Sequence, residues 1–247
     1  MKKVRLDVLL TQRELVDTRS QAQGLIMTGQ VLVDETPVFK AGTKVPPDVV
    51  IRIKGQKPPF VSRGGLKLQK ALDTFEVDPT GRVCVDLGAS TGGFTDCLLQ
   101  RGAARVYAVD VGYGQLAWSL RQDERVIVME RTNARTLESL PEPIELVVGD
   151  LSFISLGKVL PAVARIAPGA DCLVLVKPQF EVGPDLVEKG GVVNSQDARD
   201  QACLNVQATA EELGFLSLGL TESPIRGAKS GNIEYLAWLR APRAQAR

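Results

Sequence analysis

From residue 83 onward the chain alternates short apolar runs with amphipathic stretches. The apolar runs have the length of strands, and the stretches between them carry apolar residues at helical spacing. Strands that alternate with helices predict an α/β fold with a parallel, doubly wound sheet, whose ligand lies over the carboxyl ends of the strands. We expect strands at 83–86, 105–110, 125–129, 144–150 and 171–177, and helices at 93–101, 114–121, 156–166 and 195–213.

The last two apolar segments, 215–220 and 233–239, follow each other without a helix between them. Two strands joined in this way pair antiparallel, because a parallel pair needs a crossover connection. An antiparallel last strand on a parallel sheet is typical of class I (Rossmann-like) methyltransferases, and dinucleotide dehydrogenases usually lack it. The sheet therefore favours a methyltransferase.

The first 55 residues have a different pattern. Residues 4–15 place Leu6, Leu9 and Leu10 on one helical face, and a second helix is expected from Thr18 to Gly29. A strand pair over 31–39 and a strand at 49–53 complete a small α+β module. Prolines and a glycine then interrupt the periodicity. We predict domains at 1–55 and 63–247, joined by a linker at 56–62.

Charge is distributed unevenly between these parts. Residues 1–67 carry twelve Lys and Arg against six Asp and Glu, a net charge of +6, whereas residues 68–247 carry eighteen against twenty-three, a net charge of −5. A basic front end indicates a polyanionic partner. No apolar run approaches the roughly 20 residues that cross a bilayer, and the charged N-terminus does not resemble a signal peptide, so we expect a cytoplasmic protein.

The strand at 83–86 ends in an acid and is followed by a cluster of small residues. Glycines let backbone approach a ligand closely, and the first N–H groups of the next helix offer donors to it. Asp110, at the end of the next strand, has the spacing of a ribose-binding carboxylate. The candidate cofactor-binding residues are Asp86, Gly88, Ala89, Ser90, Gly92, Gly93, Phe94, Asp110, Asn133 and Asp150.

Three ligand classes fit this outline. A dinucleotide fingerprint needs glycine where Ser90 stands. Residues 88–92, Gly-Ala-Ser-Thr-Gly, also have the form of a hydrolase nucleophile elbow, but the chain has no histidine for a Ser-His-acid triad. The remaining class is an S-adenosylmethionine site, in which the glycines lie beneath the methionine part and Asp110 accepts from the ribose hydroxyls.

Polar residues end successive apolar runs where burial would favour another Val or Leu: Asp86, Asp110, Asp150 and Lys177. They are expected to share the carboxyl edge of the sheet, where this architecture places catalytic groups. Asn133 either contacts the adenine edge or forms a turn. Four cysteines without Cys-x-x-Cys spacing and the lack of histidine give no metal site, and Cys84 and Cys172 are expected to be reduced core residues.

The first module resembles the S4 RNA-binding domain. The similarity lies in residues 5–7, 18–22 and 40–42, and in the pattern Leu25-Ile26-x-x-Gly29-x-Val31-x-Val33. The resemblance implies that Arg5, Arg19 and Lys40 contact RNA phosphates, with recognition of backbone and shape rather than of bases. Arg63, in the segment that follows the linker, is a further candidate for RNA contact.

Lys67, Asp150, Lys177 and Glu234 form a set that resembles the tetrad of the FtsJ-like RNA 2′-O-methyltransferases. Together with the segments 62–67, 86–95 and 149–155 and the S4-like module, the chain resembles the TlyA (hemolysin A) family of rRNA methyltransferases. The resemblance implies methylation of a cytidine ribose 2′-hydroxyl in ribosomal RNA, with S-adenosylmethionine as donor and ribosomal subunits as partners.

A ribose hydroxyl is a poor nucleophile, so a base is needed as the methyl group approaches. Lys177 is the candidate base, Lys67 supplies a nearby positive charge, Asp150 orients Lys177, and Glu234 positions Lys67. A lysine acts as a base only when neutral, and the two acids oppose this. Lys177 could instead steer the hydroxyl and stabilise the developing alkoxide, and the sequence does not decide between these roles.

Three rival functions differ from this one. The intact tetrad argues against an RNA-binding assembly factor that has no catalytic activity. A pore-forming hemolysin is suggested only by the family name and lacks a spanning segment. Carbon-5 methylation of a pyrimidine needs a cysteine nucleophile, and no cysteine ends a strand at the catalytic edge.

Overall fold

The computed structural model describes residues 3–13, 15–16, 18–55, 58–227 and 231–243. The chain forms two compact units, residues 1–59 and 60–247, and each is described by itself. Residues 56 and 57 of the predicted linker lie outside the described residues, and residues 60–62 belong to the second unit.

The first unit packs two short helices against small antiparallel sheets. The sequence predicts one helix over residues 4–15. In the structure Val4 and Arg5 instead pair as a strand with Val45 and Lys44, so helix α1 begins only at Leu6. The Thr18 side chain accepts from Gln21 N and starts the second helix as predicted. The elements are β1 (Val4–Arg5), α1 (Leu6–Gln12), α2 (Arg19–Met27), β2 (Val31–Val33), β3 (Thr36–Pro37), β4 (Lys44–Val45) and β5 (Ile51–Ile53).

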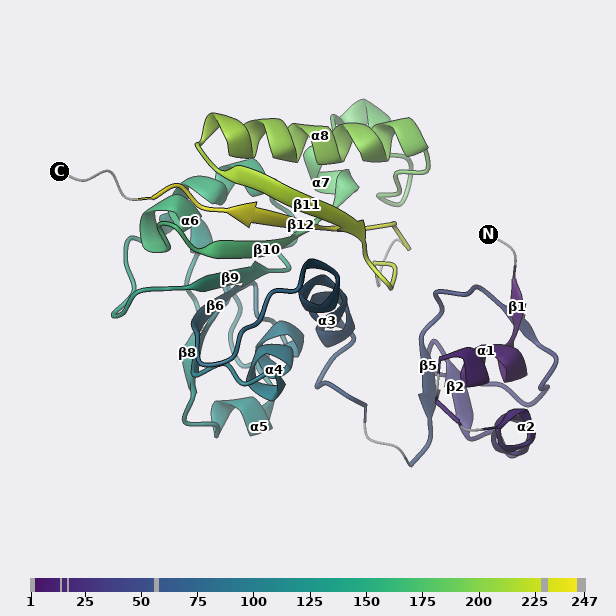
Figure 1. Ribbon diagram of the computed structural model, residues 1–247. Coiled ribbons are helices and arrows are strands. Elements are labelled where there is room, and N and C mark those ends of the chain that lie inside the picture. The colour runs from purple at the N-terminus through teal and green to yellow at the C-terminus, as the bar shows by residue number, and fades with distance from the viewer. Residues whose placement is uncertain (1–2, 14, 17, 56–57, 228–230, 244–247) are drawn as a thin grey trace. The chain divides into compact units, whose positions relative to one another are not determined.

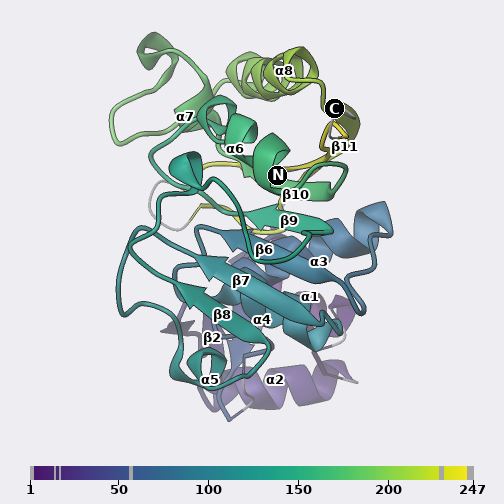
Figure 2. The ribbon, with the colours of Figure 1, turned by 90° about the vertical axis from the view of Figure 1, so that its left-hand side faces the viewer.

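The second unit is built on a seven-stranded sheet with the order β11-β12-β10-β9-β6-β7-β8. Figure 2 shows the strands from β10 to β8 side by side. Strand β12 pairs antiparallel with both neighbours, while the pairs from β10 to β8 are parallel, which confirms the predicted class I fold. The strands are β6 (Val83–Leu87), β7 (Arg105–Val109), β8 (Val126–Met129), β9 (Leu146–Gly149), β10 (Asp171–Val176), β11 (Leu216–Glu222) and β12 (Tyr235–Arg240).

Helices cover both faces of this sheet (Figure 1). Successive strand residues point to opposite faces, so Cys84 joins the core under α3 and α4, whereas Val85 joins the core under α6 and α8. The helix expected at 114–121 is shorter, because Gly114 adopts a positive φ of 72° and α5 begins only at Trp118. The helices are α3 (Gly64–Phe75), α4 (Gly93–Gln100), α5 (Trp118–Arg121), α6 (Leu160–Ile166), α7 (Pro178–Glu181) and α8 (Gln196–Glu212), with 3-10 turns η1 (Ala134–Thr136), η2 (Leu156–Lys158) and η3 (Pro184–Leu186).

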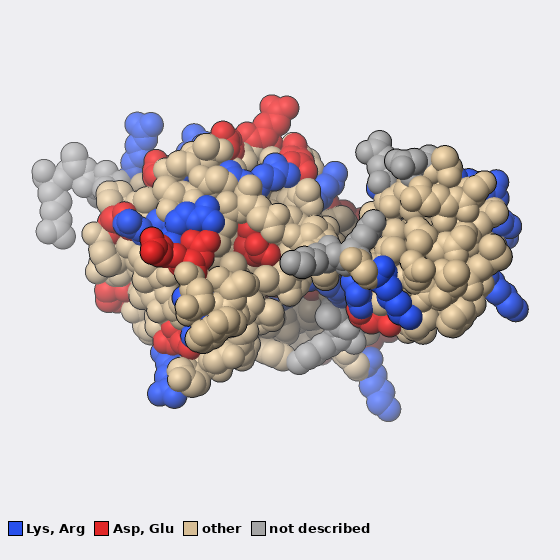
Figure 3. Space-filling view, turned by 90° about the horizontal axis from the view of Figure 1, so that it is seen from below, with Lys and Arg blue, Asp and Glu red and all other residues tan. Residues whose placement is uncertain are grey.

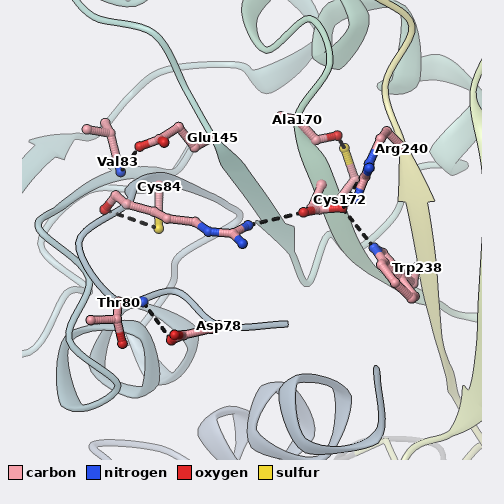
Figure 4. A network of polar contacts seen from close by, with 11 residues as sticks. Asp78, Thr80, Val83, Cys84, Glu145, Ala170, Cys172, Trp238 and Arg240 are labelled. Carbon is pink, nitrogen blue, oxygen red and sulfur yellow. Dashed lines mark hydrogen bonds and ion pairs between the residues drawn. The ribbon is translucent and has the colours of Figure 1, made fainter. Parts of the chain in front are cut away.

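A polar network closes the end of the sheet where β10 begins (Figure 4). Asp171 accepts hydrogen bonds from Arg82, Trp238 and Arg240, and so joins residues next to β6, in β10 and in β12. Cys84 and Cys172 are buried free thiols in this region, as predicted. Asp171 thus connects three neighbouring segments at this end of the sheet.

The direction of β12 determines what stands at the opposite edge. Because β12 is antiparallel, its first residue, Tyr235, pairs with Val176 at the carboxyl end of β10. Glu234 and Lys177, one residue beyond that pair, therefore lie at the same edge of the sheet.

Candidate active site

A cavity of about 630 Å³ lies at the carboxyl ends of the parallel strands, within the size range of small-ligand and cofactor sites. Its wall combines the loop after β6, the segments after β9 and β10, the start of α3 and the loop before β12. It is lined by Ser62, Arg63, Gly64, Lys67, Gly88–Thr91, Gly93, Phe94, Asp150, Ser152, Phe153, Lys177, Gln179, Phe180, Gly190, Gly191, Ile225–Gly227 and Glu234.

The four residues of the predicted tetrad converge on this wall and form a chain of ion pairs. Lys67 Nζ lies 2.7 Å from Glu234 Oε2 and 3.2 Å from Asp150 Oδ2, and Lys177 Nζ lies 2.6 Å from Asp150 Oδ1. Lys67, Lys177 and Glu234 are buried. Two lysines and two acids thus balance each other with little access to water.

The ion pairs of the tetrad determine the pKa values of Lys67 and Asp150. Burial lowers the pKa of Lys67, but the charges of Asp150 and Glu234 together outweigh burial and leave that pKa raised. Burial likewise opposes ionisation of Asp150, and the two lysines overcome it and lower the pKa of that carboxyl. Lys67 is therefore held as a cation, and Asp150 is held as an anion between the nitrogens of the two lysines.

Lys177 has a second partner besides Asp150. Its Nζ donates to Ser152 Oγ at 2.8 Å. As an ammonium this nitrogen would have three N–H donors, so the contacts with Asp150 and Ser152 would leave one for a further oxygen, and Lys177 is one of the residues that line the cavity. This donor could meet an oxygen of a substrate.

The loop between β6 and α4 forms a wall of nearly bare backbone. Gly88 adopts a φ of 85°, and a Cβ there would lie 3.0 Å from the carbonyl oxygen of Asp150. A Cβ on Gly93 would lie 2.2 Å from Ser62 Oγ and 2.8 Å from Gly65 N, so glycines let the starts of α3 and α4 approach each other beside the cavity. Asp110 stabilises the loop by accepting from Ser90 N at 2.8 Å.

Comparison with known proteins agrees with this geometry. Residues 60–241 match the FtsJ-like methyltransferase family, and residues 4–51 match the S4 domain. Over 243 residues the chain is 50% identical to the 16S/23S rRNA (cytidine-2′-O)-methyltransferase TlyA of Mycobacterium tuberculosis, a match that covers 97% of this chain and 90% of that protein. The chain belongs to the TlyA family of FtsJ-like methyltransferases.

Two further relatives of this TlyA-family chain carry the hemolysin name. Hemolysin A of Brachyspira hyodysenteriae is 40% identical over 238 residues, which are 95% of this chain and 98% of that protein. A solved structure from Streptococcus thermophilus, named as a hemolysin, is 43% identical with a TM-score of 0.75 and covers 100% of this chain and 92% of that one. The family resemblance inferred from the motifs is confirmed.

Not every predicted residue of the TlyA-family chain reaches the cavity. Asp86 is fully buried on the α4 side of β6, where its Oδ2 accepts from Thr95 N and Thr95 Oγ1. Asn133 accepts from Arg135 N and caps η1, which is the turn contact that the sequence offered as one of two expectations for this residue. Gly92 lies beneath the loop, where a Cβ would collide with Leu120.

Several lining residues were not predicted from the sequence. Ser152, which contacts Lys177, and Phe153 follow Asp150 in the loop after β9, and Phe153 is 80% exposed with a φ of 63°. Its ring lies 5.5 Å from that of Phe180, which follows Lys177. A usable signal was available, because both aromatic residues stand three residues after a strand-terminal charged residue.

The predicted RNA contacts lie in both units. In the first unit, Arg5 and Arg19 are about half exposed and Lys40 is exposed, and Lys and Arg side chains are visible on its surface (Figure 3). In the second unit, Arg63 lines the cavity and donates to the carbonyl oxygen of Arg226.

The described residues lack two features. They contain no group of three or more Cys, Asp or Glu side chains placed to hold a metal ion. Every helix in the described ranges is also too short or too polar to cross a membrane.

Proposed function

We propose that this chain transfers the methyl group of S-adenosylmethionine to the ribose 2′-hydroxyl of a cytidine in ribosomal RNA, with ribosomal subunits as its partners. The observation that carries the proposal is the convergence of Lys67, Asp150, Lys177 and Glu234 beside a glycine-walled cavity. The M. tuberculosis relative is named for this chemistry on 16S and 23S rRNA.

The residues present fit S-adenosylmethionine, which supplies the methyl group on a sulfonium sulfur. A side chain at Gly88 would crowd the backbone of Asp150, so the bare loop is a cradle that a Cβ would fill. We assign the cavity-lining residues of this loop, Gly88–Thr91, Gly93 and Phe94, to the methionine part. Asp110 is assigned to the ribose hydroxyls, because a carboxylate that accepts from Ser90 N and Gly112 N still has lone pairs for further donors. Asp86 and Gly92 shape the loop from below.

Lys177 is assigned to the reacting hydroxyl. During transfer the new bond joins the ribose oxygen to the methyl carbon, the carbon–sulfur bond breaks, and the hydroxyl proton must leave. As an amine, Lys177 would take that proton; as an ammonium, it would donate to the oxygen and stabilise the charge that develops there, and the hydroxyl proton would pass to water. Asp150 and Ser152 fix its nitrogen in both cases, and Lys67, held by Glu234, adds a positive charge.

Replacing Lys177 by alanine tests the proposal. We expect methyl transfer to rRNA to fall at least 100-fold, because the group at the hydroxyl is lost, while S-adenosylmethionine affinity stays within a few-fold. Labelled methyl transfer, mapping of 2′-O-methylcytidine and calorimetric titration of the methyl donor measure these effects. Lys70→Ala, an exposed lysine on the same helix as Lys67, is the control.

Lys177→Arg then separates the two roles. A guanidinium remains protonated, so partial activity would mean that the residue acts as a cation, and complete loss would favour the base.

Wild-type protein that binds rRNA without methylating it would contradict the proposal and leave an assembly factor. Methyl groups on cytosine carbon 5 would also contradict it; none of the four cysteines lines the cavity described above, and burial raises the pKa of the Cys84 thiol to about 12.

A further inference from the structure

A buried carboxylate lies next to the exposed arginines of the first unit. Asp7 has no exposed surface. Its Oδ1 accepts from Arg5 Nε and Val8 N, and its Oδ2 accepts from Arg5 Nη2, Arg19 Nε and Gln23 Nε2, all at 2.9–3.0 Å. Hydrogen bonding from Arg5, supported by Gln23 and Arg19, outweighs burial and holds the pKa of this carboxyl well below its usual range.

The two arginines differ in their contacts from Arg13, which follows helix α1. Arg13 donates to the carbonyl oxygens of Pro47 and Val49 and so holds a loop in place. The side chains of Arg5 and Arg19 are 45% and 53% exposed. Their contacts with Asp7 use two of the five N–H groups of Arg5 and one of those of Arg19.

One carboxylate oxygen thus holds two guanidinium groups side by side. Two cations at this distance repel each other, and a single buried anion offsets that repulsion while a net charge of +1 remains on the cluster. Long basic side chains ordinarily lose rotamer freedom when they bind a phosphate. Here Asp7 fixes both arginines in the free protein, so little freedom is left to lose.

We propose that Asp7 is the positioning residue of an RNA phosphate site, at which Arg5 and Arg19 together hold neighbouring phosphates of the substrate backbone. The inference rests on the proposed function, because it takes RNA as the substrate. It adds a requirement that charge alone would not predict, namely that an acidic residue strengthens binding to a polyanion.

Asp7→Asn tests this through the sign of its effect. The substitution raises the net charge of the unit by one. If Asp7 acted only by neutralising positive charge, its loss would give tighter binding to rRNA and a steeper dependence of binding on salt. A positioning role predicts the opposite. We expect about tenfold weaker binding at physiological salt, and a plot of log Kd against log salt concentration that is shallower by one to two, since two phosphate contacts are weakened.

Glu35→Gln is the matched control. Glu35 is exposed and makes a two-point ion pair with Arg52, with Nη2 and Oε2 at 2.7 Å, so the substitution changes the charge equally and releases an arginine equally. We expect its rRNA affinity to be unchanged or slightly increased.

A second variant keeps the test valid if Asp7→Asn folds poorly, which circular dichroism melting of the full chain would reveal. Arg5→Lys keeps both the charge and Asp7 but cannot make the two-point contact, and should also weaken binding several-fold, whereas Arg52→Lys should not. Unchanged or tighter binding by folded Asp7→Asn, or by Arg5→Lys, would overturn the inference. Wild-type protein that fails to bind rRNA would instead overturn the proposed function.

Discussion

Asp86 should make the second unit less stable as pH rises, and Asp86→Asn should remove this dependence. The side chain is fully buried, and burial raises its pKa to about 7 from an ordinary value of 3.8, although two hydrogen bonds from Thr95 favour the ionised form. Between these two values the unfolded chain has lost the proton and the folded chain still binds it. Stability therefore falls with rising pH across this window and levels off above pH 7.

The size of the effect follows from the difference in pKa. One pKa unit corresponds to about 1.4 kcal/mol, so between pH 5 and pH 8 the wild-type free energy of unfolding should fall by about 3 kcal/mol more than that of Asp86→Asn. The asparagine retains an oxygen that can accept from Thr95 N and Oγ1. At pH 8 the variant should therefore be the more stable protein.

Urea unfolding followed by tryptophan fluorescence measures this difference. Trp118 and Trp238 are the two tryptophans of the sequence and both belong to the second unit, so the signal does not report on the first. Asp78→Asn is the control, because Asp78 is exposed and hydrogen bonds from Thr80 lower its pKa; its difference from wild type should not vary between pH 5 and pH 8. The same constancy for Asp86→Asn would refute the reasoning.

Two further substitutions test the geometry of the site. Glu234→Gln leaves the buried ammonium of Lys67 paired with Asp150 alone, which should lower the free energy of unfolding by about 3 kcal/mol and reduce methyl transfer at least tenfold. Wild-type values in urea unfolding and in the methyl-transfer assay would contradict this pairing. Gly93→Ala places a Cβ 2.8 Å from Gly65 N, so it should lower the free energy of unfolding by about 1–3 kcal/mol and displace Lys67. Gly183→Ala is the control, because a Cβ there would meet no atom within 4 Å, and it should unfold at the wild-type urea concentration.

The strand ends of the site were predictable because a charged residue that ends a long apolar run is conspicuous. Asp150 and Lys177 were found in this way, and the lack of a helix before the last strand correctly indicated an antiparallel β12. The same rule placed Asp86 at the edge, yet its side chain points toward α4. A central strand is buried on both faces, so the sequence gives no sign of which face a polar residue takes.

Contacts between distant segments account for most of the remaining differences. Val4 and Arg5 leave the predicted helix because Lys44 and Val45, some forty residues later, pair with them. Ser152 was missed because a serine in a loop looks like an ordinary turn residue until Lys177 is found beside it. Asp7 was noticed only as part of a family motif, since nothing local shows that two arginines share it.

The ion pair between Lys67 and Glu234 joins residues 167 positions apart in the sequence. The first belongs to the helix that opens the second unit, and the second precedes the strand inserted between β10 and β11. Catalytic competence thus requires that both ends of this unit be in place at the same time. Methyl-transfer activity is accordingly a sensitive measure of whether the second unit is fully folded, since a partial opening that detaches β12 would abolish activity while most of the sheet stays assembled.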